Sequence, residues 1–382
     1  MAETPAHPKK LLFVVSNDFG ELASAIYFTL GQGFDATLAL PPRLFPVHRE
    51  HLPVRACSYD AVADVVRIVD RERPDVVMLF SGYLFGVNNI FSVELLRVLV
   101  EELRARGCHI ITTDPFLGLM ANLNTSTFSD GHPKKAWLME HFANVAKMMR
   151  GVTHLYSGDI TTPASHPGQS FFNEHIIQTA TQRVESDKRL ASMVALDTDR
   201  KRWMFILSME DYGVQAAIHG RQNFDNLLIR RIQEALRAGR QPILVAPQIC
   251  LDAVRASAQA THSAILLPFC RYDLFQGLAL EAEYLFYWNI FSNSILERVA
   301  NGLPVIFFDH GHIARSIPPL HRLGMQAYYG NAAVHFFSQS SALDPLLLAD
   351  LAAVQEEPMA GAMAGYRKLS TPAQVIDRIL GT

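Results

Sequence analysis

The residue types best suited to chemistry gather where an apolar, strand-like run gives way to a segment of helical period. Ser292, Asn293 and Ser294 open such a segment, which ends at Gly302. The free N–H groups and the dipole of a helix N-terminus attract phosphate, and short polar side chains add further donors. Glu297 lies three residues after Ser294, a spacing that also fits a capping box serving only the helix. The pattern therefore indicates either a phosphate site beside a carboxylate or an ordinary helix start.

Two histidines follow the next strand-like run. His310 and His312 stand at positions i and i+2, so they can share one side of an extended segment and suggest a metal site. No third ligand has supporting spacing. We therefore predict no metal at these histidines.

Other segments that follow strand-like runs could supply a general base. Asp114 ranks first, because Pro115 holds it extended at a strand end, where it aims into a site or starts a turn. Asp18 and Glu21 come next, although their spacing also fits a capping box. His132, in a polar stretch, ranks last. For each of these residues the structural interpretation stays open beside the catalytic one.

Short apolar runs alternate with segments of helical period along both halves of the chain. The runs cover residues 11–15, 36–40, 76–80, 109–112 and 152–156, and then 203–208, 242–246, 264–268, 284–288 and 304–308. Apolar strands separated by helices indicate parallel sheets covered on both faces. We predict an α/β protein with two Rossmann-like, doubly wound domains facing a cleft, where the carboxyl ends of the strands would bind ligands.

The predicted domains are 1–195 and 196–382. Residues 157–200 interrupt the alternation, and 171–196 is predicted to be one polar helix. Amphipathic helices are expected over 60–73 and 91–106. A final helix over 372–380 is a candidate for packing back on the N-terminal domain.

Composition excludes several classes of protein. The 382 residues carry 34 Lys+Arg and 37 Asp+Glu, a net charge of −3, which disfavours a nucleic-acid binder. The four cysteines show neither a disulfide framework nor zinc spacing. Neither a signal peptide nor a membrane span is indicated, so we expect a soluble, cytoplasmic protein and leave peripheral membrane contact open. The sequence also lacks Walker A, Gly-x-Gly-x-x-Gly and Gly-x-Ser-x-Gly motifs.

The run FSNSILERVANGLPVIFFD, residues 291–309, resembles the donor-binding segment of GT-B glycosyltransferases. Residues 203–213, WMFILSMEDYG, are similar to that family's first donor-domain strand and phosphate-facing loop, and residues 264–273, AILLPFCRYD, to its base-reading strand and loop. The resemblance covers most of 200–310, and it implies that the domain 196–382 is on the donor side and the domain 1–195 on the acceptor side. It implies that Glu297 holds the ribose, and it assigns phosphate, base or diphosphate contacts to Ser208, Phe269, Arg271, Ser292, Asn293 and Ser294. It also leads us to expect a hydrogen bond from His310 or His312 to the sugar or a phosphate. Retaining members often carry Glu where this chain has Asn289.

The resemblance implies a glycosyltransferase that moves a sugar from a nucleotide-sugar to an unidentified acceptor, which could be a small molecule, a glycan or a protein. The nucleotide-sugar is a co-substrate, and no cofactor or metal is expected. Two alternatives remain: a non-hydrolysing nucleotide-sugar 2-epimerase of the same fold, and a catalytically inactive binding or partner subunit.

Overall fold

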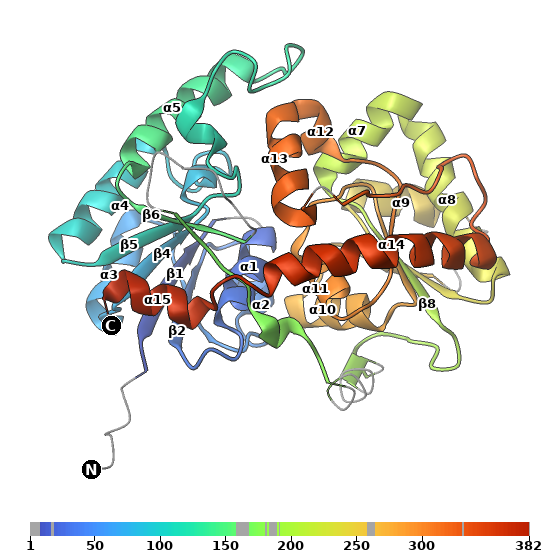
Figure 1. The fold of residues 1–382 in the computed structure, drawn as a ribbon, viewed down its shortest axis with the longest axis horizontal. Helices are drawn as coiled ribbons and strands as arrows, with labels where there is room; N and C mark the ends of the chain where they lie inside the picture. Colours follow the sequence, from blue (N-terminus) through green and yellow to red (C-terminus); the bar gives the residue numbers. More distant parts are fainter. Residues whose placement is uncertain are drawn as a thin grey trace. The chain divides into compact units, whose positions relative to one another are not determined.

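The chain forms two compact units. The computed structural model describes residues 8–16, 19–157, 168–179, 182, 189–190, 192–257, 264–330 and 332–381 (Figure 1). Unit 1 comprises Met1–Ile176, Arg322–Tyr328 and Gly365–Thr382, and unit 2 comprises Ile177–His321 and Tyr329–Ala364. The first boundary between the units lies between residues 176 and 177, whereas the domain boundary expected from the sequence lies between residues 195 and 196.

Unit 1 is built on a parallel sheet in the order β3-β2-β1-β4-β5-β6-β7. Its strands are β1 (Lys10–Val15), β2 (Asp35–Leu40), β3 (Arg55–Ser58), β4 (Val76–Phe80), β5 (His109–Thr113), β6 (Thr153–Tyr156) and β7 (Gly168–Ser170). The central strands β1 and β4 are almost wholly buried, as expected for a sheet covered on both faces.

Unit 1 also contains α-helices. They are α1 (Phe19–Thr29), α2 (Phe45–His48), α3 (Val62–Glu72), α4 (Val93–Ala105), α5 (Lys135–Met149) and α15 (Pro372–Leu380), with single 3₁₀ turns at Gly82–Leu84, Leu119–Asn122 and Glu174–Ile176. The expected amphipathic helices are confirmed as α3 and α4. In α3, Val65, Ile68 and Val69 are buried while the Asp64 carboxylate accepts from the N–H of Ala61. The final helix is confirmed as α15, and its Asp377 pairs with Lys9 within unit 1.

The prediction of one helix over 171–196 is wrong at its start. Strand β7 ends at Ser170 and a single 3₁₀ turn follows. The cause is Asn173, whose Nδ2 donates to the carbonyls of Tyr27 at 2.7 Å and Leu30 at 2.8 Å, so the segment is held against α1 and its end. Residues 180–181, 183–188 and 191 of the predicted helix lie outside the described part of the chain.

Unit 2 has a second parallel sheet, in the order β10-β9-β8-β11-β12. Its strands are β8 (Arg202–Ile206), β9 (Gln241–Val245), β10 (Ile265–Leu267), β11 (Tyr284–Tyr287) and β12 (Val305–Phe307). Its helices are α7 (Met209–His219), α8 (Arg221–Arg237), α9 (Gln248–Ala256), α10 (Tyr272–Glu281), α11 (Asn293–Ala300) and α12 (His312–Ser316), with α13 (Pro318–Tyr329) and α14 (Pro345–Tyr366) running partly in each unit. An aromatic core that includes Trp203, Phe286 and Trp288 fills the space beside the central strands. The predicted α/β class with two parallel sheets is confirmed.

None of the helices in the described ranges combines the length and apolarity needed to cross a bilayer.

Arg298 fixes α11 in unit 2. Its side chain is fully buried, and its Nη1 donates to the carbonyls of Ala279 at 3.0 Å and Ala282 at 2.8 Å. Its Nη2 donates to the carbonyl of Pro304 at 2.7 Å, just before β12. One guanidinium therefore satisfies carbonyls at the end of α10 and at the start of β12 while holding α11 between them.

We expect Arg298→Met to lower the free energy of unfolding by about 3 kcal/mol or more, because several buried carbonyls lose their donor. Urea unfolding monitored by circular dichroism measures this effect. Arg237→Met, on the exposed side of α8, is the matched control and should change stability by less than about 0.5 kcal/mol. An equal effect of both substitutions would contradict the anchoring role.

Candidate functional site

The carboxyl ends of β8, β11 and β12 are joined by one buried carboxylate, Asp211, in the first turn of α7. Its Oδ2 accepts from Ser208 Oγ and from Asn289 Nδ2, both at 2.8 Å. Its Oδ1 accepts from the backbone N and the ring Nδ1 of His312, both at 2.9 Å. Burial opposes ionisation, but the hydrogen bonds from His312 and Ser208 outweigh it and hold the pKa of Asp211 below its ordinary value. Asp211 is therefore ionised, and the hydrogen bonds that it accepts hold three loops together.

Gly311 lets the loop after β12 reach this carboxylate. Its φ is +86°, and a Cβ there would lie 2.6 Å from the Cβ of Asn289. Only glycine adopts this backbone conformation without strain and also leaves the space free. The close approach brings the N–H of His312 to Asp211.

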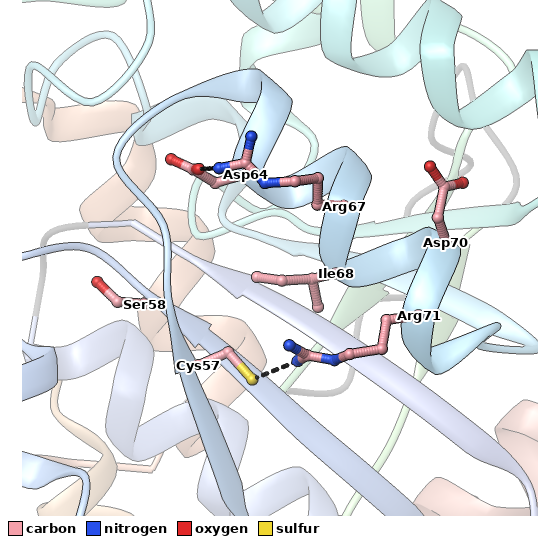
Figure 2. Close-up of a pocket in the computed structure, with 7 residues that line it drawn as sticks. All are labelled: Cys57, Ser58, Asp64, Arg67, Ile68, Asp70 and Arg71. Carbon is pink, nitrogen blue, oxygen red and sulfur yellow. Dashed lines mark hydrogen bonds and ion pairs between the residues drawn. The ribbon is translucent and has the colours of Figure 1, made fainter.

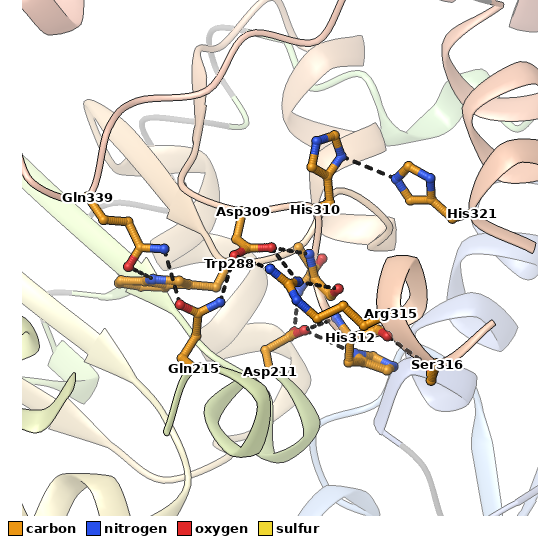
Figure 3. A network of polar contacts seen from close by, with 12 residues as sticks. Asp211, Gln215, Trp288, Asp309, His310, His312, Arg315, Ser316, His321 and Gln339 are labelled. Carbon is orange, nitrogen blue, oxygen red and sulfur yellow. Dashed lines mark hydrogen bonds and ion pairs between the residues drawn. The ribbon is translucent and has the colours of Figure 1, made fainter. Parts of the chain in front are cut away.

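Asp309, two residues after the end of β12, is the first of a second series of residues joined by polar contacts (Figure 3). Arg315 donates to both of its carboxylate oxygens, at 2.6 and 2.9 Å, and Gln215 Nε2 donates to Oδ2 at 2.9 Å. Gln339 links Gln215 to the indole N–H of Trp288. Burial opposes ionisation of Asp309, but these donors, Arg315 first, keep its pKa below the ordinary value. This carboxylate is also committed to holding loops together.

The N-terminus of α11 has no side-chain cap. Ser292 is the N-cap residue, yet its Oγ contacts the Oγ of Ser294 at 2.9 Å instead of a backbone N–H of the helix. Ser294 Oγ in turn bonds the buried hydroxyl of Tyr287. The helix begins at Asn293, so Ser294 and Glu297 do not occupy the N-cap and N3 positions, and the capping-box interpretation of this pair is wrong.

Glu297 lies one turn into α11 and is 9% exposed. Its Oε1 accepts a hydrogen bond from Nε2 of Gln276, on α10. Burial raises the pKa of Glu297 to about 7, and the bond from Gln276 only partly offsets this effect. Near neutral pH this carboxyl group is therefore divided between its neutral and charged forms.

We expect Glu297→Gln to stabilise the protein at pH 8 by an amount on the order of 1–3 kcal/mol and to have little effect at pH 5. The carboxyl group has a raised pKa in the folded state. Its contribution to stability is therefore complete below its unfolded pKa and is lost as the pH rises through about 7. Urea midpoints at both pH values measure the difference. The exposed Glu356→Gln on α14 is the control, and an equal gain at pH 5 and pH 8 would argue against ionisation as the cause.

His310 and His312 point to different partners. His312 Nδ1 lies 2.9 Å from Asp211, whereas His310 Nδ1 lies 3.2 Å from Nε2 of His321, on α13. The ring of His310 also packs against Phe336, with centroids 4.1 Å apart. Across the described ranges, no group of three or more His, Cys, Asp or Glu side chains is arranged to hold a metal ion.

The remaining donor-side candidates lie around the start of α10. Phe269 is half exposed in the loop after β10. Arg271 pairs with Asp273 through Nε at 3.0 Å and Nη2 at 2.6 Å. The cation predicted to meet a diphosphate is thus already paired with a carboxylate.

In unit 1, Asp114 follows β5 and is almost completely buried. Its Oδ1 accepts from the N–H of Phe116 at 2.8 Å, and its Oδ2 from the N–H of Gly118 at 2.9 Å, so it shapes the turn that follows. Burial raises its pKa to about 6 against the effect of these two bonds. Burial and the charge of Asp114 raise the pKa of the neighbouring Tyr156, whose buried hydroxyl has no hydrogen-bond partner among the described residues.

The other acid–base candidates differ in setting. Glu21 is buried in the first turn of α1. His132 Nδ1 accepts from the N–H of Lys134 at 3.2 Å, just before α5 begins, which is the local contact of a helix start. Asp18 lies outside the described residues. These residues stay predictions.

A hollow of about 730 Å³ opens in unit 1 between β3 and α3 (Figure 2). Among its lining residues, Arg71 Nη2 lies 2.9 Å from the Sγ of Cys57, and Arg67 pairs with Asp64. It contains none of the predicted site residues.

Sequence reasoning missed the two organising carboxylates, Asp211 and Asp309. A signal for Asp211 exists: it lies three residues after Ser208, and Ser208 Oγ accepts from the N–H of Asp211 at 3.0 Å as an N-cap. No local signal identifies its bonds to Asn289 and His312, which come from distant parts of the chain.

Comparison of folds places the chain beside two groups of enzymes. UDP-N-acetylglucosamine 2-epimerase from Neisseria meningitidis, bound to UDP-GlcNAc, matches with a TM-score of 0.55 at 10% identity over 98% of this chain and 100% of that one. The glycosyltransferase SnogD from Streptomyces nogalater gives 0.53 at 10% over 98% and 99%, and the spinosyn rhamnosyltransferase SpnG gives 0.52 at 12% over 98% and 100%. No protein-family model and no curated protein matches the sequence.

These likenesses, at such low identity, establish the fold alone. It is the two-unit α/β fold that GT-B glycosyltransferases share with UDP-GlcNAc 2-epimerases.

Proposed function

We propose that this chain is a metal-independent GT-B glycosyltransferase whose unit 2 binds a nucleotide-sugar. One observation carries the proposal: the uncapped N-terminus of α11 lies one turn before Glu297, whose buried carboxyl group titrates near neutral pH. The N–H groups of such a helix end bind a diphosphate, with Ser292, Asn293 and Ser294 as additional donors. Glu297 would accept hydrogen bonds from the ribose hydroxyls.

The same arrangement supports departure of the nucleotide. Transfer breaks the bond between the sugar and the diphosphate oxygen, and that oxygen keeps the electron pair. A helix N-terminus stabilises the negative charge that develops there, so the site needs no metal ion for this step. Ser208 fits as a further phosphate contact, Phe269 as a base contact, and His310 as a sugar or phosphate contact.

In unit 1, Asp114 is the favoured base. An acceptor hydroxyl attacks the anomeric carbon, and its proton passes to a carboxylate. A pKa of about 6 leaves Asp114 mostly ionised at pH 7 and still basic enough to take the proton. The unpartnered hydroxyl of Tyr156 beside it would meet the acceptor. Asp18, Glu21 and His132 are the remaining candidates.

We expect one family of sugar nucleotides to raise the melting temperature in a panel of UDP-, GDP-, CMP- and dTDP-sugars. A ligand at 100 times its Kd adds about 2.7 kcal/mol to stability. Glu297→Ala should abolish the shift, whereas the exposed Glu356→Ala should keep it. The absence of a shift with every nucleotide would overturn the proposal.

A 2-epimerase is the second candidate, because epimerases of this fold match the chain with TM-scores of 0.55. Proton NMR of the stabilising sugar nucleotide, with and without candidate acceptors, separates the two functions. A transferase releases free nucleotide only when an acceptor is present, and an epimerase changes the sugar without one. We expect acceptor-dependent release that falls at least about 100-fold in Asp114→Asn, with the melting shift retained. A stabilised protein that does neither would be an inactive binding or partner subunit.

A further inference from the structure

Two histidines form a hydrogen-bonded pair beyond the carboxyl ends of the unit 2 strands. His310 Nδ1 and His321 Nε2 are 3.2 Å apart, and the two rings meet edge to face with centroids 5.1 Å apart (Figure 3). In such a contact one ring donates and the other accepts, so at least one imidazole is neutral while the bond exists. The pair can take up one proton but resists a second.

Two opposite charges lie near His310. Asp309, next to His310 in the chain, attracts a proton, but both its oxygens are bound by Arg315, which repels one. Partial burial of the ring is the largest effect on His310 and lowers its pKa, followed by the opposed charges of Asp309 and Arg315. The rings packed on the two histidines, Phe336 and Phe291, carry no charge. Without a ligand His310 is therefore neutral at pH 7.

The pair lies close to the α11 N-terminus. The ring of His321 packs against that of Phe291, with centroids 5.6 Å apart, and Phe291 directly precedes the N-cap Ser292. His310 itself is exposed, and its Nε2 makes no hydrogen bond within the described ranges. The pair is thus linked to the α11 N-terminus through the contact between His321 and Phe291, and the exposed His310 gives a ligand access to an imidazole nitrogen. Arg271, the cation that the sequence suggested for this role, is already paired with Asp273.

We propose that the His310–His321 pair binds an anionic oxygen of the sugar nucleotide and takes up one proton as it does so. This inference rests on the proposed donor site in unit 2. The anionic oxygen belongs either to the diphosphate or to the carboxylate of an acidic sugar. A bound anion stabilises the imidazolium form, so binding must strengthen as the pH falls.

Titration calorimetry with UDP-glucose and UDP-glucuronate between pH 6 and pH 8 tests the proposal. If the melting panel selects dTDP-sugars, the corresponding dTDP-sugars are used instead. Their diphosphates carry no group that titrates in this range, so any linked proton belongs to the protein. One linked proton changes affinity by at most about tenfold per pH unit, and we expect binding about tenfold tighter at pH 6 than at pH 8.

The variants His310→Gln and His321→Gln should reduce this change to less than about twofold, because Gln keeps a hydrogen-bonding group but does not titrate. His219→Gln, at the far end of α7, is the matched control and should keep the full change. Ligand-free melting curves show whether each variant folds. Titrations in buffers of different ionisation enthalpy should detect proton uptake by the wild type directly, whether or not a variant folds.

The two ligands distinguish the source of the anion. If the affinity for both sugar nucleotides depends on pH, the anionic oxygen belongs to the diphosphate. If only the affinity for UDP-glucuronate does, the oxygen belongs to the sugar carboxylate. Tight binding with no pH dependence, or with the same dependence in both folded His variants, overturns the inference and leaves the proposed function standing. Failure of every sugar nucleotide to bind overturns both.

Discussion

One buried carboxylate, that of Asp211, holds the loops of unit 2 in place, because a buried charge must be surrounded by hydrogen-bond donors. Asp211 is 1% exposed, and it stays ionised only because three loops bring donors to it. Those donors are Ser208 after β8, Asn289 after β11 and His312 after β12. Through these bonds the carboxylate fixes the positions of the three loops relative to one another. Because an unpaired buried charge is costly, these loops are held in one arrangement.

The carboxyl groups of the chain divide into two kinds. Asp211 and Asp309 each accept four hydrogen bonds and have pKa values below their ordinary values, which suits groups that maintain geometry. Glu297 and Asp114 have raised pKa values, because burial outweighs the few donors they receive. Groups poised near neutral pH are the ones whose charge a ligand can change. This contrast separates supporting residues from candidate functional ones within the same fold.

Much of the fold was predictable from the sequence, because buried parallel strands are apolar throughout and helices between them are periodic. The start of α11 was also predictable, since short polar residues followed by a helical pattern mark an N-terminus. What local spacing could not show is which polar group meets which. The Ser294–Glu297 spacing suggested a capping box, yet Gln276, from another helix, binds the carboxyl group. The pairing of His310 with His321 likewise depends on how the first residues of α13 pack within unit 2.

The path of the chain between the units bears on how the protein is made. Unit 1 includes residues 365–382, and the N–H of Phe172 bonds the carbonyl of Ser370 at 3.0 Å while Gln32 accepts from the N–H of Ala373. During translation, strands β1 to β6 can pair before residues 365–382 have been synthesised, whereas the edge of the sheet at β7 is completed only when Ser370 arrives. Unit 2 is synthesised in that interval, so the first unit to start folding is the last one to be completed.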